Sequence, residues 1–104
     1  MRRAAKVDLS QREIVKTLRG MGASVEPRLA RVGEGVPDLL VGWRGVNILL
    51  ETKTGDRPCD RKLSSDEQRW HDSWAGSVAI VSTPEEAYMA VLAAARAAGV
   101  HPNS

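Results

Sequence analysis

GVPDLLVG at residues 35–42 and NILLETK at residues 47–53 are two apolar runs, and each carries an acidic residue at one end. The short segment between them predicts a β-hairpin whose two-residue turn is Arg44 and Gly45. This turn places Asp38 directly opposite Glu51, with Cβ atoms about 4.5–5.5 Å apart. Because side chains alternate along a strand, Lys53 shares the face of Glu51. Two carboxylates and an ammonium group at one end of a hairpin predict a divalent-metal site.

A surface salt bridge is the simpler interpretation of these charges, and such pairs contribute little to stability. The apolar residues beside them favour a functional site instead. One face of the hairpin carries Leu39, Val41, Ile48 and Leu50, and the other carries Leu40 and Leu49. Strands that are apolar on both faces are usually covered on both sides. Charges at the end of such strands are costly unless something uses them.

Three helix starts are expected from N-capping patterns. Ser10 and Glu13 form a capping box that precedes an apolar stripe of Ile14, Val15, Leu18 and Met21. The segment SSDEQ at residues 64–68 opens a second helix, in which Ser65 and Gln68 fit a box of the same kind. The third helix begins at Thr83, with Pro84 in the first helical position and a reciprocal glutamate. Its expected buried residues are Ala87, Tyr88, Val91, Leu92 and Ala95.

The remaining expected strands are residues 23–26 and 77–81. The order of elements along the chain is then αβββαβα, which is an α/β arrangement. At 104 residues the chain is expected to form a single domain over residues 1–104. Residues 1–9 and 100–104 are expected to be flexible ends.

Composition excludes several classes of protein. No apolar run approaches the roughly 20 residues of a membrane span, and the basic N-terminus lacks the apolar stretch of a signal peptide. Cys59 is the sole cysteine, which rules out an internal disulfide and a cysteine zinc cluster. We therefore expect a cytoplasmic protein, in the host cytoplasm if a phage encodes it.

The net charge of +2 is too small to identify a nucleic-acid-binding protein by itself. The placement of the basic residues is more informative, because many fall in expected loops. The candidates for contacts to DNA phosphates are Arg28, Arg31, Arg57, Arg61 and Lys62. For any single one of them, a solvated surface position is an equally good interpretation.

Pro37-Asp38 followed by Glu51-Thr52-Lys53 resembles the PD-(D/E)xK nuclease superfamily. The resemblance is closest to the VRR-NUC (virus-type replication-repair nuclease) branch, in which Gly-x-Pro-Asp and Glu-x-Lys precede a helix that bears a glutamine, here Gln68. The chain is also similar to archaeal Holliday-junction resolvases, which begin with an Arg-Glu-containing helix like residues 12–18. The likeness implies a compact restriction-endonuclease-like αβββαβ core with a mixed sheet flanked by helices.

The resemblance also implies a set of site residues. Asp38, Glu51 and the backbone carbonyl of Thr52 would bind Mg²⁺, for which Mn²⁺ would substitute, and Lys53 would act beside the metal. Glu13 aligns with an acidic ligand on the first helix, although a capping role explains it equally well. Gln68 would reach the site only if the second helix is covered on both sides.

The aromatic residues and His71 have less specific interpretations. Trp70 and Trp74 lie four apart on a helix and are expected in the core, whereas Trp43 beside the turn is the better candidate for a contact surface. His71 lies beside Asp72, where a structural or exposed position is expected, with DNA contact as the alternative.

The function expected from these features is Mg²⁺-dependent hydrolysis of DNA phosphodiester bonds at branched, Holliday-junction-like structures in phage-type replication, recombination or repair. No major-groove reading helix or zinc module is recognisable, so selectivity for DNA shape is expected. Compact relatives act as homodimers, and the resemblance implies the same here. The alternatives are a less specific DNA nuclease and a non-catalytic DNA-binding or assembly module on the same fold.

Overall fold

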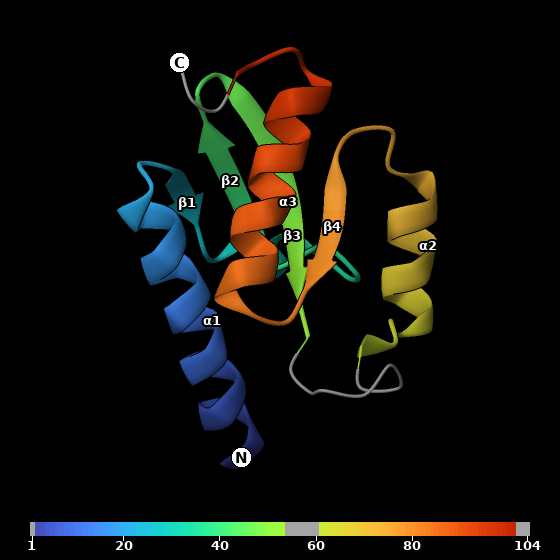
Figure 1. The fold of residues 1–104 in the computed structure, drawn as a ribbon. Helices are drawn as coiled ribbons and strands as arrows, with labels where there is room; N and C mark the ends of the chain where they lie inside the picture. The colour runs from blue at the N-terminus through green and yellow to red at the C-terminus, as the bar shows by residue number, and fades with distance from the viewer. Residues whose placement is uncertain (1, 54–60, 102–104) are drawn as a thin grey trace.

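A four-stranded mixed sheet in the order β1-β2-β3-β4 forms the centre of the molecule (Figure 1). The computed structural model describes residues 2–53 and 61–101, with side chains from Ser10 onward. The strands are β1 (Ser24–Glu26), β2 (Leu39–Trp43), β3 (Val46–Thr52) and β4 (Val78–Val81). The helices are α1 (Arg2–Gly20), the short 3-10 helix η1 (Leu29–Val32), α2 (Ser65–Ser73) and α3 (Pro84–Ala97). The expected α/β core with a mixed sheet is confirmed.

The central hairpin forms in the predicted register. Leu39 pairs with Leu50 and Trp43 pairs with Val46. Arg44 and Gly45 both have positive φ angles, 51° and 82°, as the twist of a two-residue hairpin turn requires. On its other edge, β3 pairs in parallel with β4, and the amide of Lys53 extends this pairing by donating to the carbonyl of Val81 at 2.9 Å.

One face of the sheet carries the hydrophobic core. Leu39, Val41 and Leu50 are fully buried there, and α1 and α3 cover them. The principal core residues that the two helices contribute are Ile14, Leu18, Ala87, Val91, Leu92 and Ala95.

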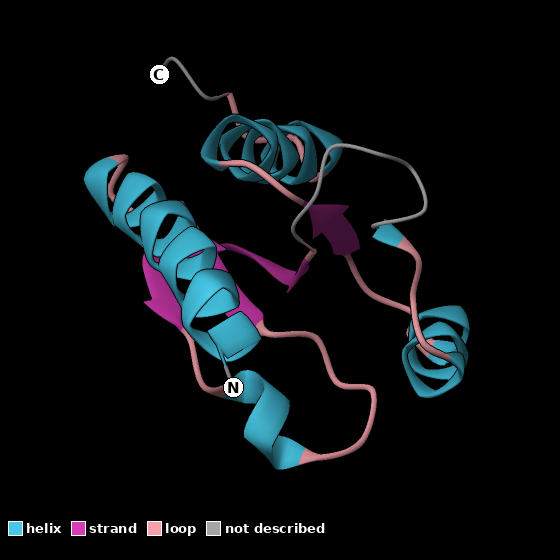
Figure 2. Ribbon diagram, turned by 90° about the horizontal axis from the view of Figure 1, so that it is seen from below, coloured by secondary structure: helices cyan, strands magenta, loops and turns pink. Residues whose placement is uncertain are grey.

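The opposite face is covered only in part, contrary to expectation. Leu49 is buried on that face, but Leu40 and Ile80 are exposed. Figures 1 and 2 both show α2 standing beside β4, away from α1 and α3. Cover on this face is therefore concentrated near the end where β3 reaches Glu51 and Thr52.

The predicted start of the first helix is wrong. Helix α1 begins at Arg2, so Ser10 lies inside it and cannot form an N-terminal capping box with Glu13. Alanine and lysine at positions 4–6 have high helix propensity, and they allow the helix to extend back through residues expected to be a flexible end. The expected C-terminal end, residues 100–104, is described as far as His101.

The start of α2 differs from expectation by one residue. The N-cap is Ser64, and its box partner is Glu67, whereas the sequence interpretation paired Ser65 with Gln68. Helix α3 has the predicted N-cap, because the Thr83 hydroxyl accepts from the amide of Glu86 at 3.1 Å. The predicted reciprocal bond is not formed, because the Glu86 carboxylate accepts from the amide of Ser82 at 2.7 Å instead.

Four aromatic residues lie elsewhere than expected. Trp43 is in the core, because its indole N–H finds a partner in the Met21 carbonyl at 3.1 Å. Trp70 and Trp74 stack on each other with ring centroids 4.6 Å apart. Trp74, the C-cap of α2, is 46% exposed, and α2 itself buries no residue. Tyr88 is exposed on α3. Within the described residues, no helix is long and apolar enough to span a membrane.

Candidate active site

Asp38 and Thr52 join the open end of the hairpin. Asp38 directly precedes β2, and its Oδ2 accepts hydrogen bonds from the amide of Thr52 at 2.8 Å and from the Thr52 hydroxyl at 2.7 Å. The same hydroxyl lies 3.4 Å from Oε1 of Gln11 on α1. These bonds fix the carboxylate of Asp38 against the last residue of β3, beside Glu51.

Glu51 is a buried carboxyl group without adequate compensation. It is 3% exposed, and its Oε1 has no hydrogen-bond partner among the residues that the structure describes. Burial raises the pKa of Glu51 to about 9, and the nearby charges of Asp38 and Glu67 act in the same direction. A carboxylate in this position is costly unless a cation accompanies it.

Lys53 is the described cation nearest to Glu51, but its ammonium group lies closer to the carboxylate of Glu67. Its Nζ lies 3.9 Å from Oε2 of Glu51 and 2.7 Å from Oε1 of Glu67. The same Glu67 oxygen accepts from the amide of Ser64 at 2.8 Å. Burial acts to raise the pKa of Glu67, but the hydrogen bonds from Lys53 and Ser64 outweigh it and hold that pKa below its usual value. One carboxylate therefore caps α2 and holds Lys53.

His71 also faces this cluster. Its Nε2 is buried, lacks a hydrogen-bond partner in the described part of the chain, and lies 3.9 Å from Oε1 of Glu51. Burial lowers the pKa of His71, against the opposing charges of Glu67 and Asp72, and so favours the neutral imidazole. His71 is thus neither exposed nor remote from the site.

A close backbone approach at Gly35 brings the two halves of the site together. Gly35 has a φ of 76°, and a Cβ there would collide with the backbone of Asp66 in the first turn of α2. The glycine therefore lets the segment before Asp38 lie against the start of α2. Between them is a cleft of about 440 Å³, lined by Ala30, Arg31, Gly33, Glu34, Gly35, Val36, Asp38 and Glu67.

The structure brings together Asp38, Glu51, Thr52 and Lys53, as predicted. It does not bring Gln68 to them, because this side chain is exposed and donates to Asp72 at 2.8 Å.

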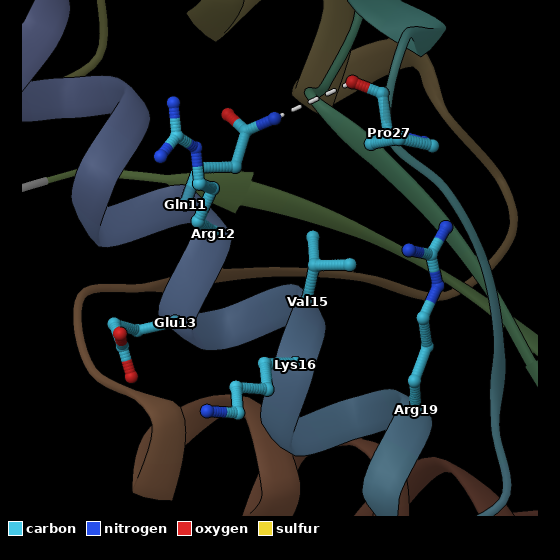
Figure 3. Close-up of a pocket in the computed structure, with 7 residues that line it drawn as sticks. All are labelled: Gln11, Arg12, Glu13, Val15, Lys16, Arg19 and Pro27. Carbon is cyan, nitrogen blue, oxygen red and sulfur yellow. Dashed lines mark hydrogen bonds between the residues drawn. The ribbon is translucent and has the colours of Figure 1, made fainter.

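Glu13 is also exposed, on a part of α1 that points away from the side chain of Gln11 (Figure 3). Among the α1 residues whose side chains are described, Gln11 contacts the site, and sequence reasoning missed it.

Glu67 was overlooked as well, although its place three residues after Ser64 marks it as a capping residue. No local pattern distinguishes Gln11, because its role depends on how α1 packs against the end of β3.

The residues that were predicted to contact DNA lie in different environments. Arg28 pairs with Glu26 at 3.0 Å, and Arg61 pairs with Glu86 at 2.9 Å. Arg31 lines the cleft beside Asp38, and Lys62 is exposed. Arg57 lies outside the described residues.

Comparison with known proteins identifies the fold. No protein-family model matches the sequence, and no curated protein is significantly similar to it. A solved structure titled "VRR_NUC domain" superposes with a TM-score of 0.65 at 22% sequence identity, covering 83% of this chain and 94% of that one. The protein has a VRR-NUC-like fold.

The donor set at the end of this VRR-NUC-like hairpin fits a hard divalent cation. Among the described residues, no three histidine, cysteine, aspartate or glutamate side chains are grouped as ready metal ligands. Two carboxylates are enough for Mg²⁺, which keeps several water molecules and binds through one or two carboxylates together with phosphate oxygens. Oε1 of Glu51, which lies close to Asp38 and finds no hydrogen-bond partner in the described part of the chain, is the feature that such a cation would explain.

Proposed function

We propose that this protein is a Mg²⁺-dependent endonuclease that hydrolyses DNA phosphodiester bonds. The observation that supports it best is the buried carboxyl group of Glu51, which lies between Asp38, Lys53 and Glu67 and has one oxygen without a hydrogen-bond partner among the described residues. Charged groups concentrated in this way at a cleft are costly for folding, and they are typical of catalytic sites. They lie at the end of the hairpin, where the resemblance implies a metal.

Asp38, Glu51 and the carbonyl of Thr52 would hold Mg²⁺, and Mn²⁺ would substitute for it. When bound, the ion supplies a nucleophilic water at neutral pH and neutralises charge on the phosphate. The hydrogen bonds from Thr52 orient Asp38 before any ligand arrives. Lys53, held by Glu67, would place its ammonium group beside the oxygens on which negative charge develops.

The direct test is a cleavage assay with Mg²⁺, Mn²⁺ or Ca²⁺ as the only divalent cation. We expect turnover with Mg²⁺ and Mn²⁺, and DNA binding without turnover with Ca²⁺, which prefers more ligands and a looser geometry. Cleavage that survives complete removal of divalent cations by EDTA would exclude this mechanism.

The preferred substrate is proposed to be branched DNA, cut by a homodimer. Two symmetric cuts in a four-way junction are made most simply by a twofold dimer, and phosphate contacts alone carry little sequence information. We expect faster cleavage of four-way, forked or flapped DNA than of linear duplex, and a dimeric mass by sedimentation. A monomer that cuts linear duplex equally fast would instead be a less specific nuclease.

Glu67→Gln is expected to lower kcat about tenfold or more while the Tm changes by only a few degrees. Glutamine keeps an acceptor for the Ser64 amide and so preserves the capping box, but it removes the charge that holds Lys53. Ser64→Ala is the matched control, because it weakens the cap, by about 1 kcal/mol, and leaves the carboxylate in place.

A double-mutant cycle tests whether Glu67 acts through Lys53. In a Lys53→Ala background, which is itself expected to lose most activity, Glu67→Gln should cause little further loss. Additive losses would mean that Glu67 acts independently of Lys53.

A further inference from the structure

A groove of about 680 Å³ runs along α1, on the side that faces the end of β1 (Figure 3). Its floor includes Val15 and Pro27, and its remaining lining residues are Gln11, Arg12, Glu13, Lys16 and Arg19. None of these residues is among the five candidates for DNA contacts that the sequence indicated.

Three of the lining residues form a basic stripe. Arg12, Lys16 and Arg19 are spaced by four and three residues, which places them on the same side of a helix. All three are exposed. Arg19 donates to the carbonyl of Val25 at 3.2 Å, whereas the side chains of Arg12 and Lys16 form no hydrogen bond or ion pair with any residue that the structure describes.

This stripe contrasts with the basic residues that were expected to contact DNA. Arg28 and Arg61 both lie within 3.0 Å of a carboxylate, so each already has part of its charge balanced. Arg12 and Lys16 therefore have more of their charge available for phosphate than Arg28 and Arg61 do.

Gln11 connects the groove to the candidate active site. Its Nε2 donates to the carbonyl of Pro27 at 3.3 Å, as Figure 3 shows. Its Oε1 lies 3.4 Å from the hydroxyl of Thr52, which in turn donates to Asp38. The side chain of Thr52 therefore links Gln11, at one end of the groove, to the carboxylate of Asp38.

We propose that the groove on α1 binds the sugar-phosphate backbone of the DNA strand that enters the candidate active site. From Arg12 to Arg19 the helix rises about 10 Å, which is long enough for the stripe to contact neighbouring phosphates of one strand. The apolar floor at Val15 and Pro27 suits deoxyribose, and the basic stripe suits phosphate. The inference rests on the proposed nuclease function for the identity of the ligand as DNA.

Removing the negative charge of Glu13 is expected to strengthen DNA binding, the opposite of the effect of removing a basic residue. Glu13 is also among the lining residues of the groove, and a carboxylate close to bound DNA repels phosphate. Glu13→Gln should therefore tighten DNA binding about two- to threefold. If Glu13 were instead the metal ligand that the resemblance implies, the same change would lower metal affinity and cleavage without improving DNA binding.

The experiment measures binding of labelled four-way and linear DNA by fluorescence anisotropy in Ca²⁺ over a range of NaCl concentrations. The variant Arg12→Gln with Lys16→Gln should bind both DNAs about tenfold more weakly, and its salt slope should fall by about two.

The matched control is Arg44→Gln with Arg96→Gln, which removes the same charge at the β2–β3 turn and at the end of α3. These positions lie at the end of the sheet opposite the candidate site (Figure 1). We expect less than a twofold change in DNA affinity. Equal weakening by the two double variants would show an effect of net charge alone and would overturn the proposal.

Failure of this inference is distinguishable from failure of the proposed function. A wild-type protein that cleaves DNA, with a groove variant that binds DNA normally, would reject the groove and leave the nuclease. A wild-type protein that binds DNA through the groove but never cleaves it would retain the groove and reject the nuclease.

Discussion

Asp38→Asn and Glu51→Gln are each expected to reduce Mg²⁺-dependent cleavage by about three orders of magnitude. Each change removes one proposed metal ligand and almost no volume. The stabilisation of developing charge by a metal is worth several kcal/mol, and each 1.4 kcal/mol or so is a factor of ten in rate. Steady-state cleavage of a labelled junction in Mg²⁺ measures the loss.

Two controls separate chemistry from folding in this experiment. After the Asp38→Asn change, the new side chain would still offer an amide oxygen to the amide and hydroxyl of Thr52, so the hairpin end should remain closed. DNA affinity in Ca²⁺ should stay within about threefold of wild type for both variants, because the phosphate contacts lie elsewhere. Wild-type cleavage by Asp38→Asn would reject the proposed site altogether.

The metal-free protein is expected to lose stability as the pH rises from about 5 to 9. Below the unfolded pKa of Glu51, near 4.5, this residue is protonated in both states and imposes no penalty. Between 4.5 and about 9, the unfolded chain ionises while burial keeps the folded carboxyl protonated, so unfolding releases a proton and becomes easier. Above about pH 9 the folded carboxyl group also ionises, and the loss of stability reaches its full size. Such a shift corresponds to a loss on the order of several kcal/mol.

Denaturant unfolding in EDTA at several pH values measures this dependence. Glu51→Gln should be more stable than the wild type at pH 8. Its stability should also fall much less as the pH rises, because an amide does not ionise. Added Mg²⁺ should restore wild-type stability at pH 8 and leave Glu51→Gln nearly unchanged, since ligand binding stabilises only the state that binds it. A wild type whose stability rises between pH 5 and 8 in EDTA would contradict the assigned environment of Glu51.

Short-range features of the sequence were sufficient to predict the hairpin and its register. The turn at Arg44 and Gly45 requires positive φ angles, and the apolar alternation on either side permits one register that buries Leu39 and Leu50. The position of Asp38 beside Thr52 follows from that register. The N-cap of α3 at Thr83 was predictable for the same reason, because capping involves residues only three apart.

The start of α1 shows the limit of local patterns. Ser10 and Glu13 have the spacing of a capping box, but that spacing is used only where the preceding residues leave the helix. Here the helix extends back to Arg2, so Ser10 is an interior residue and Glu13 lines a groove. A capping pattern thus marks a place where a helix is able to begin rather than one where it must.

What the sequence by itself determined was the α/β order of elements, the hairpin, and the cluster of Asp38, Glu51 and Lys53, because each depends on residues close along the chain or paired through one short turn. Only the tertiary structure decided which side chains of α2 lie near Glu51 and Lys53. The approach of Gly35 to the first turn of α2 brings Glu67 to Lys53 and His71 to Glu51, and turns Gln68 and Trp74 outward. The physical reason is that α2 buries no residue of its own. Its periodicity therefore does not indicate which side faces the sheet, and a backbone contact outside the helix sets its orientation.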